Sequence, residues 1–205
     1  MRSRSTRIVA PTTMAVPLSQ LKDQLRITTD AQDDFLTSLL KDSISWIEEY
    51  TGRSLMYQQW ENAIDVEGYP LESDYGQGSF IPLSRGPLYS TSPIVSIKSY
   101  TIDDVESTMS ASNYWADIPN NRVVLKSFMS WPVDMRALRS MVVLYYTGYS
   151  QADQEKIPRS LRRAILELAS YWFVTPSAVL IGSISKELEF GIREKCAPFN
   201  LNMGF

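Results

Sequence analysis

The chain has 205 residues, 44% of them hydrophobic and 21% charged, which is the composition of an ordinary globular protein. It contains no histidine, and therefore lacks the most common general base and the most common ligand of transition metals. Its net charge of -3 argues against a protein whose main task is to grip nucleic-acid phosphates. These features favour a structural or binding protein over an enzyme.

The single cysteine and the chain start bear on where the protein works. Cys196 leaves a free thiol, which suits assembly in a reducing cytoplasm, and we expect it to be partly buried and unreactive. The basic start of the chain is followed by an apolar run too short for a signal peptide. No apolar run approaches the roughly 20 residues that cross a bilayer. We therefore expect neither export nor membrane contact.

Helical spacing begins after an N-terminal arm, residues 1–17. Pro17 suits the first turn of a short helix whose leucines share one face. A longer helix is predicted from Asp30, interpreted as its N-cap, to Gly52, interpreted as its C-terminal stop. Residues 18–54 thus form the first part of a helical frame.

The longer helix is apolar over about half of its circumference, a wider arc than one core contact needs. Packing inside its own fold would explain the width. A core contact combined with a contact to a neighbouring subunit would explain it equally well. For the subunit contact, the predicted residues are Leu36, Leu40, Ile44 and Ile47.

From residue 55 to residue 150 the pattern changes to short runs of β-branched and aromatic residues, interrupted by Gly, Pro, Asn and Asp. This pattern predicts a β-rich insertion. Turns are expected at Asp103-Asp104 and Asn120-Asn121. The strands could form a small sandwich or a barrel. They are predicted at 58–66, 80–83, 94–101, 105–109, 114–116, 122–125 and 141–146.

Helical spacing returns after Pro158 and predicts a central helix within residues 156–176, which ends at Thr175-Pro176. Residues 177–205 follow as a loop, a short helix from Lys186 to Cys196 and an apolar arm. Because helices from both chain ends flank the insertion, the predicted fold class is α+β. It is mainly a helical bundle with a large inserted β-rich subdomain.

No residue pattern points to catalysis. The carboxylate pairs Asp33-Asp34, Glu48-Glu49 and Asp103-Asp104 fall on helices or in a turn, where neighbouring side chains diverge. Gly76-Gln77-Gly78 does not lie between a strand and a helix, as a phosphate-binding turn requires. We predict no catalytic residue, metal or cofactor, and interpret Glu67-Ser79 as a loop open to a partner. The alternative enzyme is a hydrolase or lyase with a β-rich, carbohydrate-like cleft built on Asp and Trp residues.

Arginines form two candidate contact groups. The first lies in the N-terminal arm and could touch DNA or an acidic protein surface, and we expect neighbours in an assembly to hold this arm. A DNA-binding module that uses it is the alternative function. These arginines are Arg2, Arg4 and Arg7.

The second group lies at the start of the central helix, where positive charge is unfavourable against the helix dipole unless it is paired. Arg163 could pair with Glu167 along its own helix, in the weaker orientation. A salt bridge to a neighbouring subunit is the other possibility. The residues concerned are Arg159, Arg162 and Arg163.

Several segments, taken in their order and spacing, resemble the head-tail connector family of long-tailed bacteriophages and gene transfer agents. They are Val9-Ala10-Pro11, 16–26, Asp33-Asp34-Phe35-Leu36, 47–55, Gln59-Trp60, 81–88, 145–149 and 157–166. The sequence departs from the family pattern at Gln20, where an acidic residue is common. It also departs at Thr175-Pro176, where the family's helix usually runs further.

The resemblance implies a structural virion protein at the head-tail interface, assembled in the host cytoplasm. It implies a homo-oligomeric ring, commonly of twelve copies, that docks beneath the portal protein. The ring would continue the DNA channel for packaging and ejection without sequence-specific binding of the duplex. It would also meet a downstream neck or tail-completion protein, a stopper or tail terminator.

Within that assembly, we expect the C-terminal segment to reach the portal, because an exposed apolar tail usually marks a binding site. The predicted portal-binding residues are Phe190, Phe199, Leu201, Met203 and Phe205.

Overall fold

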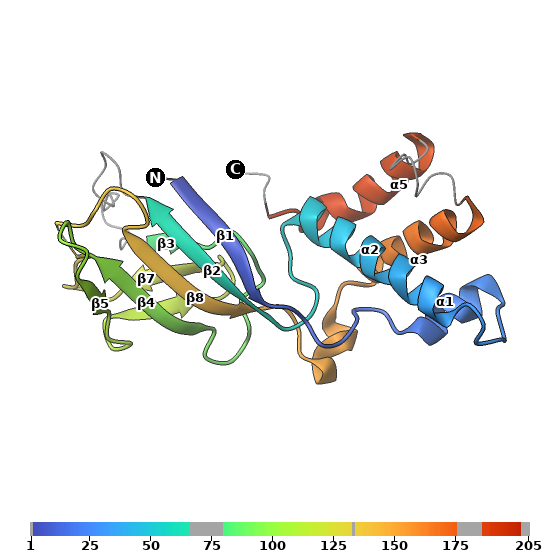
Figure 1. Ribbon diagram of the computed structural model, residues 1–205, viewed down its shortest axis with the longest axis horizontal. Coiled ribbons are helices and arrows are strands. Elements are labelled where there is room, and N and C mark those ends of the chain that lie inside the picture. Colours follow the sequence, from blue (N-terminus) through green and yellow to red (C-terminus); the bar gives the residue numbers. More distant parts are fainter. Residues whose placement is uncertain (1, 66–79, 133, 176–185, 202–205) are drawn as a thin grey trace. The chain divides into compact units, whose positions relative to one another are not determined.

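The structure is a computed structural model that describes residues 2–65, 80–132, 134–175 and 186–201 (Figure 1). The chain divides into two compact units. The sheet unit consists of Met1–Pro11 and Tyr57–Gly148, and the helical unit consists of Thr12–Met56 and Tyr149–Phe205. Each unit is therefore built from two separate stretches of the chain.

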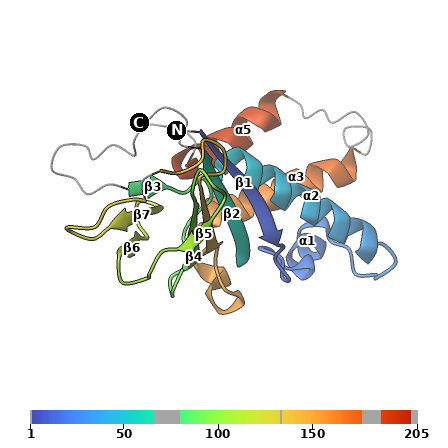
Figure 2. The same cartoon turned by 60° about the vertical axis from the view of Figure 1, so that its left-hand side comes forward.

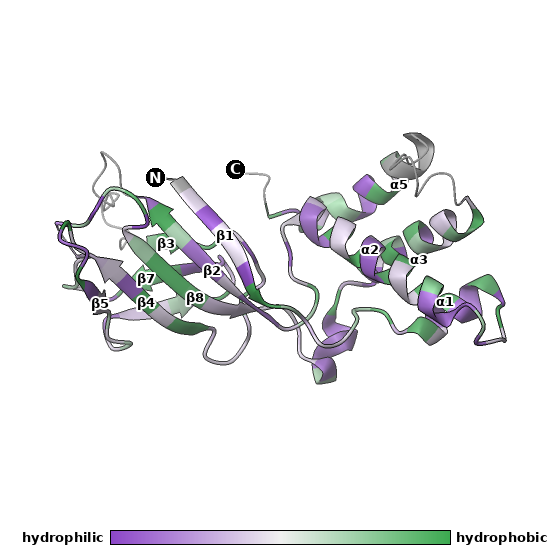
Figure 3. Cartoon of the chain, viewed as in Figure 1, coloured by the Kyte–Doolittle hydropathy of each residue, from purple (hydrophilic) through white to green (hydrophobic). Residues whose placement is uncertain are grey.

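The helical unit takes its helices from both stretches, as the spacing of apolar residues predicted. These helices are α1 (Leu18–Leu25), α2 (Asp33–Thr51), α3 (Arg159–Val174) and α5 (Lys186–Cys196), with 3-10 helices η1 (Gln151–Lys156) and η2 (Ala197–Phe199). Helix α3 contacts α1, α2 and α5, which confirms its central position. Along α2 and α3, apolar and polar residues alternate in Figure 3, as expected for helices with a buried side.

The ends of α2 follow from local chemistry. Asp33 and Asp34 occupy its first turn, where a negative charge is favourable beside the positive helix end. Gly52 ends it with a φ of 68°, a left-handed conformation that a residue without a Cβ adopts at little cost. The predicted N-cap was wrong: Gln32 takes that position, and Asp30 instead pairs with Lys22 at 2.7 Å.

The helical core is formed by apolar side chains from α1, α2, α3 and α5. Burial of each large side chain stabilises the unit by about 1.5–3 kcal/mol, and so outweighs a cap worth about 1 kcal/mol. Its buried residues include Leu21, Leu36, Leu39, Leu40, Ile47, Leu161, Ile165, Leu168 and Ile192.

The sheet unit contains two antiparallel sheets that share one core (Figure 2). The larger has the order β1 (Arg2–Val9), β2 (Gln58–Asp65), β8 (Met141–Thr147), β4 (Ile94–Tyr100) and β5 (Glu106–Thr108). The smaller has the order β3 (Phe80–Pro82), β7 (Arg122–Leu125) and β6 (Tyr114–Asp117). Two sheets facing one core correspond to a sandwich rather than a closed barrel.

The predicted strands of the insertion all occur, each with ends within one residue of those expected. Both predicted turns occur as well, because Asp104 and Asn121 adopt φ values of 60° and 53°. These residues tolerate the left-handed region better than most others.

The prediction of an N-terminal arm held by neighbouring molecules is corrected by the structure. Residues 2–9 form strand β1, which pairs with β2 from Arg2 opposite Asp65 to Val9 opposite Gln59. The physical reason is that the backbone N–H and C=O groups of β2 offer hydrogen bonds to a further strand. An edge strand can form these bonds without burying apolar side chains on both of its faces. A neighbour in an assembly is therefore not needed to hold this segment.

The fold class α+β is confirmed, but a mainly helical chain is not, since the strands build a unit of their own. Within the part of the chain that the structure describes, no helix has the length and apolar character needed to cross a membrane.

Candidate interaction surfaces

The structure does not support the predicted subunit contact on α2. Three of its residues, Leu36, Leu40 and Ile47, have an exposed fraction of 0%, and that of Ile44 is 9%. The wide apolar arc of α2 is covered by α1, α3 and α5 of the same unit. These side chains therefore offer no surface to a neighbouring subunit.

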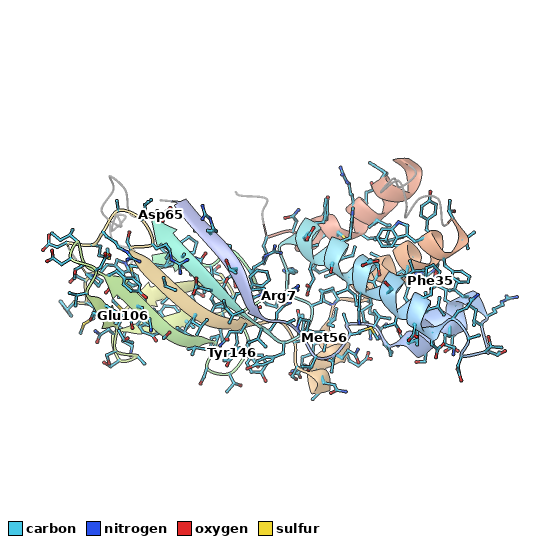
Figure 4. All side chains as sticks on the ribbon, in the orientation of Figure 1. Arg7, Phe35, Met56, Asp65, Glu106 and Tyr146 are labelled. Carbon is cyan, nitrogen blue, oxygen red and sulfur yellow. The ribbon has the colours of Figure 1, made fainter. Side chains whose placement is uncertain are left out.

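An apolar patch does remain exposed at one end of the helical unit. Phe35, in the first turns of α2, is 46% exposed and lies with its ring centre 6.3 Å from that of Phe173 (Figure 4). Val174, the last residue of α3, is 74% exposed. The sequence placed Phe35 on the apolar arc but gave no sign that this end of the arc stays uncovered.

The arginines of α3 pair largely within the chain. The distance from Arg162 to Glu155 is 2.9 Å, and that from Arg163 to Glu167 is 3.0 Å. Burial alone would raise the pKa of Glu167, but hydrogen bonds from Lys195 and Arg163 outweigh it and hold the pKa below its ordinary value. Arg159 is exposed, and an intersubunit salt bridge stays a prediction for it.

The C-terminal segment is docked on its own helical unit as far as the structure describes it. The Arg53 Nε donates to the Phe199 carbonyl at 2.6 Å, and its guanidinium lies 5.7 Å from the centre of the Phe199 ring. The Leu201 N–H donates to the Thr51 carbonyl at 2.8 Å. The end of α2 therefore holds η2 and the residues that follow it.

Docking divides the predicted portal-binding residues. Phe190 on α5 is 64% exposed and Leu201 is 37% exposed, whereas Phe199 packs partly buried against the helical core. Met203 and Phe205 lie outside the described residues. The exposed apolar surface described in this segment therefore comes from Phe190 and Leu201.

The N-terminal arginines do not form one basic surface. Arg7 faces the core side of the sheet, with its guanidinium 6.0 Å from the centre of the Trp60 ring. Arg4 is exposed and lies opposite Ala63 of β2. It is three residues from Arg7, and side chains alternate between the two faces along a strand, so Arg4 lies on the other face of the sheet. For Arg2, the backbone belongs to β1. This division weakens the DNA-binding alternative.

The described carboxylates have structural roles. Glu48 is buried and its Oε1 accepts a hydrogen bond from the Leu55 N–H at 2.6 Å, which fastens the chain beyond α2. Asp104 pairs with Arg136 at 2.8 Å beside the turn. Among the described residues, no cluster of acidic or cysteine side chains could hold a metal ion. The Gly76-Gln77-Gly78 stretch and the Glu67-Ser79 loop lie outside them.

One pocket of about 350 Å³ opens beside β5. Hydroxyl, amide and apolar side chains line it, and no carboxylate is among these lining residues. Its lining consists of Ser99, Ser107, Thr108, Met109, Ser110, Asn113, Ser130, Trp131 and Pro132.

The thiol of Cys196 is fully buried in the helical core. Burial raises its pKa to about 11, against a smaller opposite effect of Lys195. A thiol needs its ionised form to react, so this cysteine is an unreactive core residue.

The two-unit α+β fold is shared with chains of known particles. It matches a chain in "Neck of empty GTA particle computed with C6 symmetry" with a TM-score of 0.71 and 17% identity, over 98% of this chain and 97% of that one. A chain in "Neck of native GTA particle computed with C12 symmetry" matches at 0.68 and 16%, with the same coverage. A chain in "Virion of native gene transfer agent (GTA) particle" gives 0.69 and 16%, also over 98% and 97%.

The family resemblance is carried by the start of the chain. Residues 16–75 match the sequence model of the phage gp6-like head-tail connector proteins. None of the curated protein sequences matches significantly. The matched stretch contains α1, α2 and β2, so it joins the first half of the helical unit to the sheet. The resemblance to head-tail connectors is confirmed.

Proposed function

We propose that this chain is a structural subunit of the neck of a tailed phage or gene transfer agent. Copies form a ring of twelve beneath the portal protein, extend the DNA channel and join head to tail. The observation that carries this proposal is the shared fold over almost the whole of both chains with a chain of a GTA neck. The connector match of residues 16–75 supports it independently.

The ring itself is supported by the symmetry of the similar particles. Their necks were computed with C6 and C12 symmetry, which are symmetries of closed rings. A ring requires each subunit to offer two different surfaces, one to each neighbour. Within the described residues, Phe35 and Val174 offer exposed apolar surface for such a contact, and Phe35 lies beside the partly buried Phe173.

The portal contact falls to the C-terminal side of the chain. Phe190 and Leu201 are exposed apolar residues on the helical unit, and Met203 and Phe205 follow them in sequence. Exposed apolar surface commonly marks a protein interface. We assign the portal to this region, and a stopper or tail terminator to the opposite side of the ring.

Duplex DNA passes through the ring without sequence-specific binding. A net charge of -3 fits this role, because tight phosphate contacts would oppose sliding during packaging and ejection.

Deletion of the gene tests this function. Heads should package DNA and accumulate without tails, and the chain supplied from a plasmid should restore complete particles. Complete particles formed in the absence of the chain, or tails and heads that both fail to form, would overturn the proposal.

A further inference from the structure

The larger sheet has a long free edge. Strand β1 spans eight residues, and β2 is its neighbour on one side. Among the described residues, no strand pairs with its other side. Alternate residues of β1 therefore point backbone N–H and C=O groups outward, a template that proteins normally cover or block.

Within the described parts of the chain, the opposite edge of the same sheet has no pairing strand either. Glu106, Ser107 and Thr108 of β5 are all exposed. The hairpin that leads into β5 exposes two apolar residues, Ile102 at 70% and Val105 at 60%. An exposed apolar hairpin next to an open strand edge favours an interface over a solvent-facing surface.

The two edges differ in the charged side chains that they carry. The β1 sequence contains three arginines and no acidic residue, whereas β5 contains Glu106 and follows Asp103-Asp104. Figure 4 shows Arg7 and Glu106 on these two strands. Pairing of two β1 strands would bring like charges together, which is destabilising, so β1 fits an acidic edge better than a copy of itself.

The register of the sheet places the two edges at matching positions. One row of cross-strand pairs runs across all its strands through Arg4, Ala63, Val142, Lys98 and Thr108. The next row runs through Ser3, Ile64, Met141, Ser99 and Ser107. Ile64 and Met141 are fully buried, so their row faces the core and the row of Arg4 lies on the other face.

Glu106 lies on the same face as Arg4, since it is two residues before Thr108. It is already paired with Lys98 at 2.7 Å and with the Tyr100 hydroxyl at 2.9 Å, yet its side chain is 45% exposed. The hydrogen bonds from Lys98 and Tyr100 lower its pKa, so the carboxylate is ionised at neutral pH. It can therefore attract a further cation.

We propose that β1 of one copy pairs with the free edge of β5 in the next copy, with Arg4 opposite Thr108 and diagonally next to Glu106 on the same face. This inference rests on the proposed ring, whose interfaces must join two different surfaces. Neighbours in a closed ring are related by rotation without a rise. With the strands along the ring axis, residues of the same cross-strand row therefore meet. β1 and β5 run in the same direction within one sheet, so the new pair is parallel.

Sheet twist limits the length of this contact. Successive strands turn by about 20–25°, and this turn accumulates over the four steps from β1 to β5, so the two edges can lie side by side only over a short stretch. The three residues of β5 match such a stretch. The contact fixes the register between neighbours, while the apolar patches of the helical unit contribute further contact area.

A cysteine pair tests the contact directly. Arg4→Cys combined with Thr108→Cys places two thiols on neighbouring strands of adjacent copies, within the span of about 4.4–6.8 Å between Cα atoms that a disulfide needs. Within one copy the two residues lie across the five strands of the sheet, about 19 Å apart at about 4.8 Å per strand, and cannot join. The native Cys196 is buried and does not compete.

Particles assembled with this variant are oxidised and run on a non-reducing gel. We expect a ladder of bands at multiples of the monomer mass, which reducing agent removes, and only the monomer for either single variant. Dimers from Arg4→Cys alone would show pairing between two β1 strands and would overturn the inference. So would unlinked chains in particles that contain the double variant.

A charge exchange decides the matter if the cysteine variants do not enter particles. Arg4→Glu should lower the yield of complete particles, and adding Glu106→Arg should restore part of it. Lys126→Glu, an equal charge change at another exposed position of the sheet unit, should have little effect. No restoration by the second change overturns the inference. Wild-type chain missing from purified necks would instead refute the proposed function.

Discussion

At the scale of single residues, burial decides which side chains are available for chemistry or contact. Cys196, Glu48 and Ile47 are all buried, and each is occupied with holding the helical unit together. Exposed residues such as Phe190 do not form part of this core and are accessible to partners. The residue type alone did not separate these two groups.

The thiol of Cys196 should resist modification in the folded chain. With its pKa raised to about 11 by burial, the thiol is almost entirely protonated at pH 8. A disulfide reagent added at pH 8 should react slowly with the native protein and at once after denaturation. Rapid, complete labelling of native protein would show that the helical core is open around this residue.

Glu167 should contribute stability that depends on pH. Its folded pKa lies below its ordinary value of 4.5, so the contribution is present above that value and is lost as the pH falls through the folded pKa. We expect Glu167→Gln to lower the free energy of unfolding by about 0.5–1 kcal/mol at neutral pH. Denaturant titrations should find no difference from wild type at about pH 2.

The matched control is Glu194→Gln, which changes the same charge on the exposed surface of α5. Equal losses for Glu167→Gln and Glu194→Gln, or a loss at Glu167 that persists in acid, would contradict the role given to the Lys195 and Arg163 pairs.

At the scale of elements, leucine spacing and turn residues were enough to predict the helices and most strands. β1 was missed because its polar, arginine-rich sequence shows no alternation of apolar and polar residues. An edge strand can form with few buried apolar side chains, so the alternation is not required there. The wide apolar face of α2 could not show whether helices of the same chain or a neighbouring subunit bury it. Periodicity indicates which residues are buried, and not what they pack against. Whether a residue of this face, such as Phe35, is exposed depends on how far the packed helices extend along α2.

Truncation of Ile47 should therefore act on folding and not on assembly alone. Ile47→Ala opens a cavity in the helical core and should lower the free energy of unfolding by about 2–5 kcal/mol. Asp42→Ala on the exposed face of α2 should change it by less than about 0.5 kcal/mol. Thermal unfolding of the isolated subunit measures both, and an unchanged stability for Ile47→Ala would restore the interface interpretation.

The glycine within α5 offers a stabilising change. A Cβ added at Gly191 would meet nothing within 4 Å, and helical glycine costs about 0.5–1 kcal/mol relative to alanine. Gly191→Ala should raise the free energy of unfolding by that amount in denaturant titrations. A loss of stability would mean that α5 does not keep its helical conformation in solution.

At the scale of the whole molecule, two units with separate cores suit a subunit that must contact several partners at once. The helical unit exposes apolar residues near Phe35 and at Phe190, and the sheet unit exposes two complementary strand edges. Each surface lies outside a core, so partners can bind without unfolding either unit. The connector resemblance and the shared fold with neck chains agree with this division of labour.

The most direct test is an image reconstruction of necks purified from particles that carry this chain. The account predicts a closed ring of twelve copies directly beneath the portal, with the DNA channel through its centre and β1 of each copy beside β5 of the next. A neck density that contains no copy of this fold, or copies placed on the capsid or tail tip instead, would contradict it.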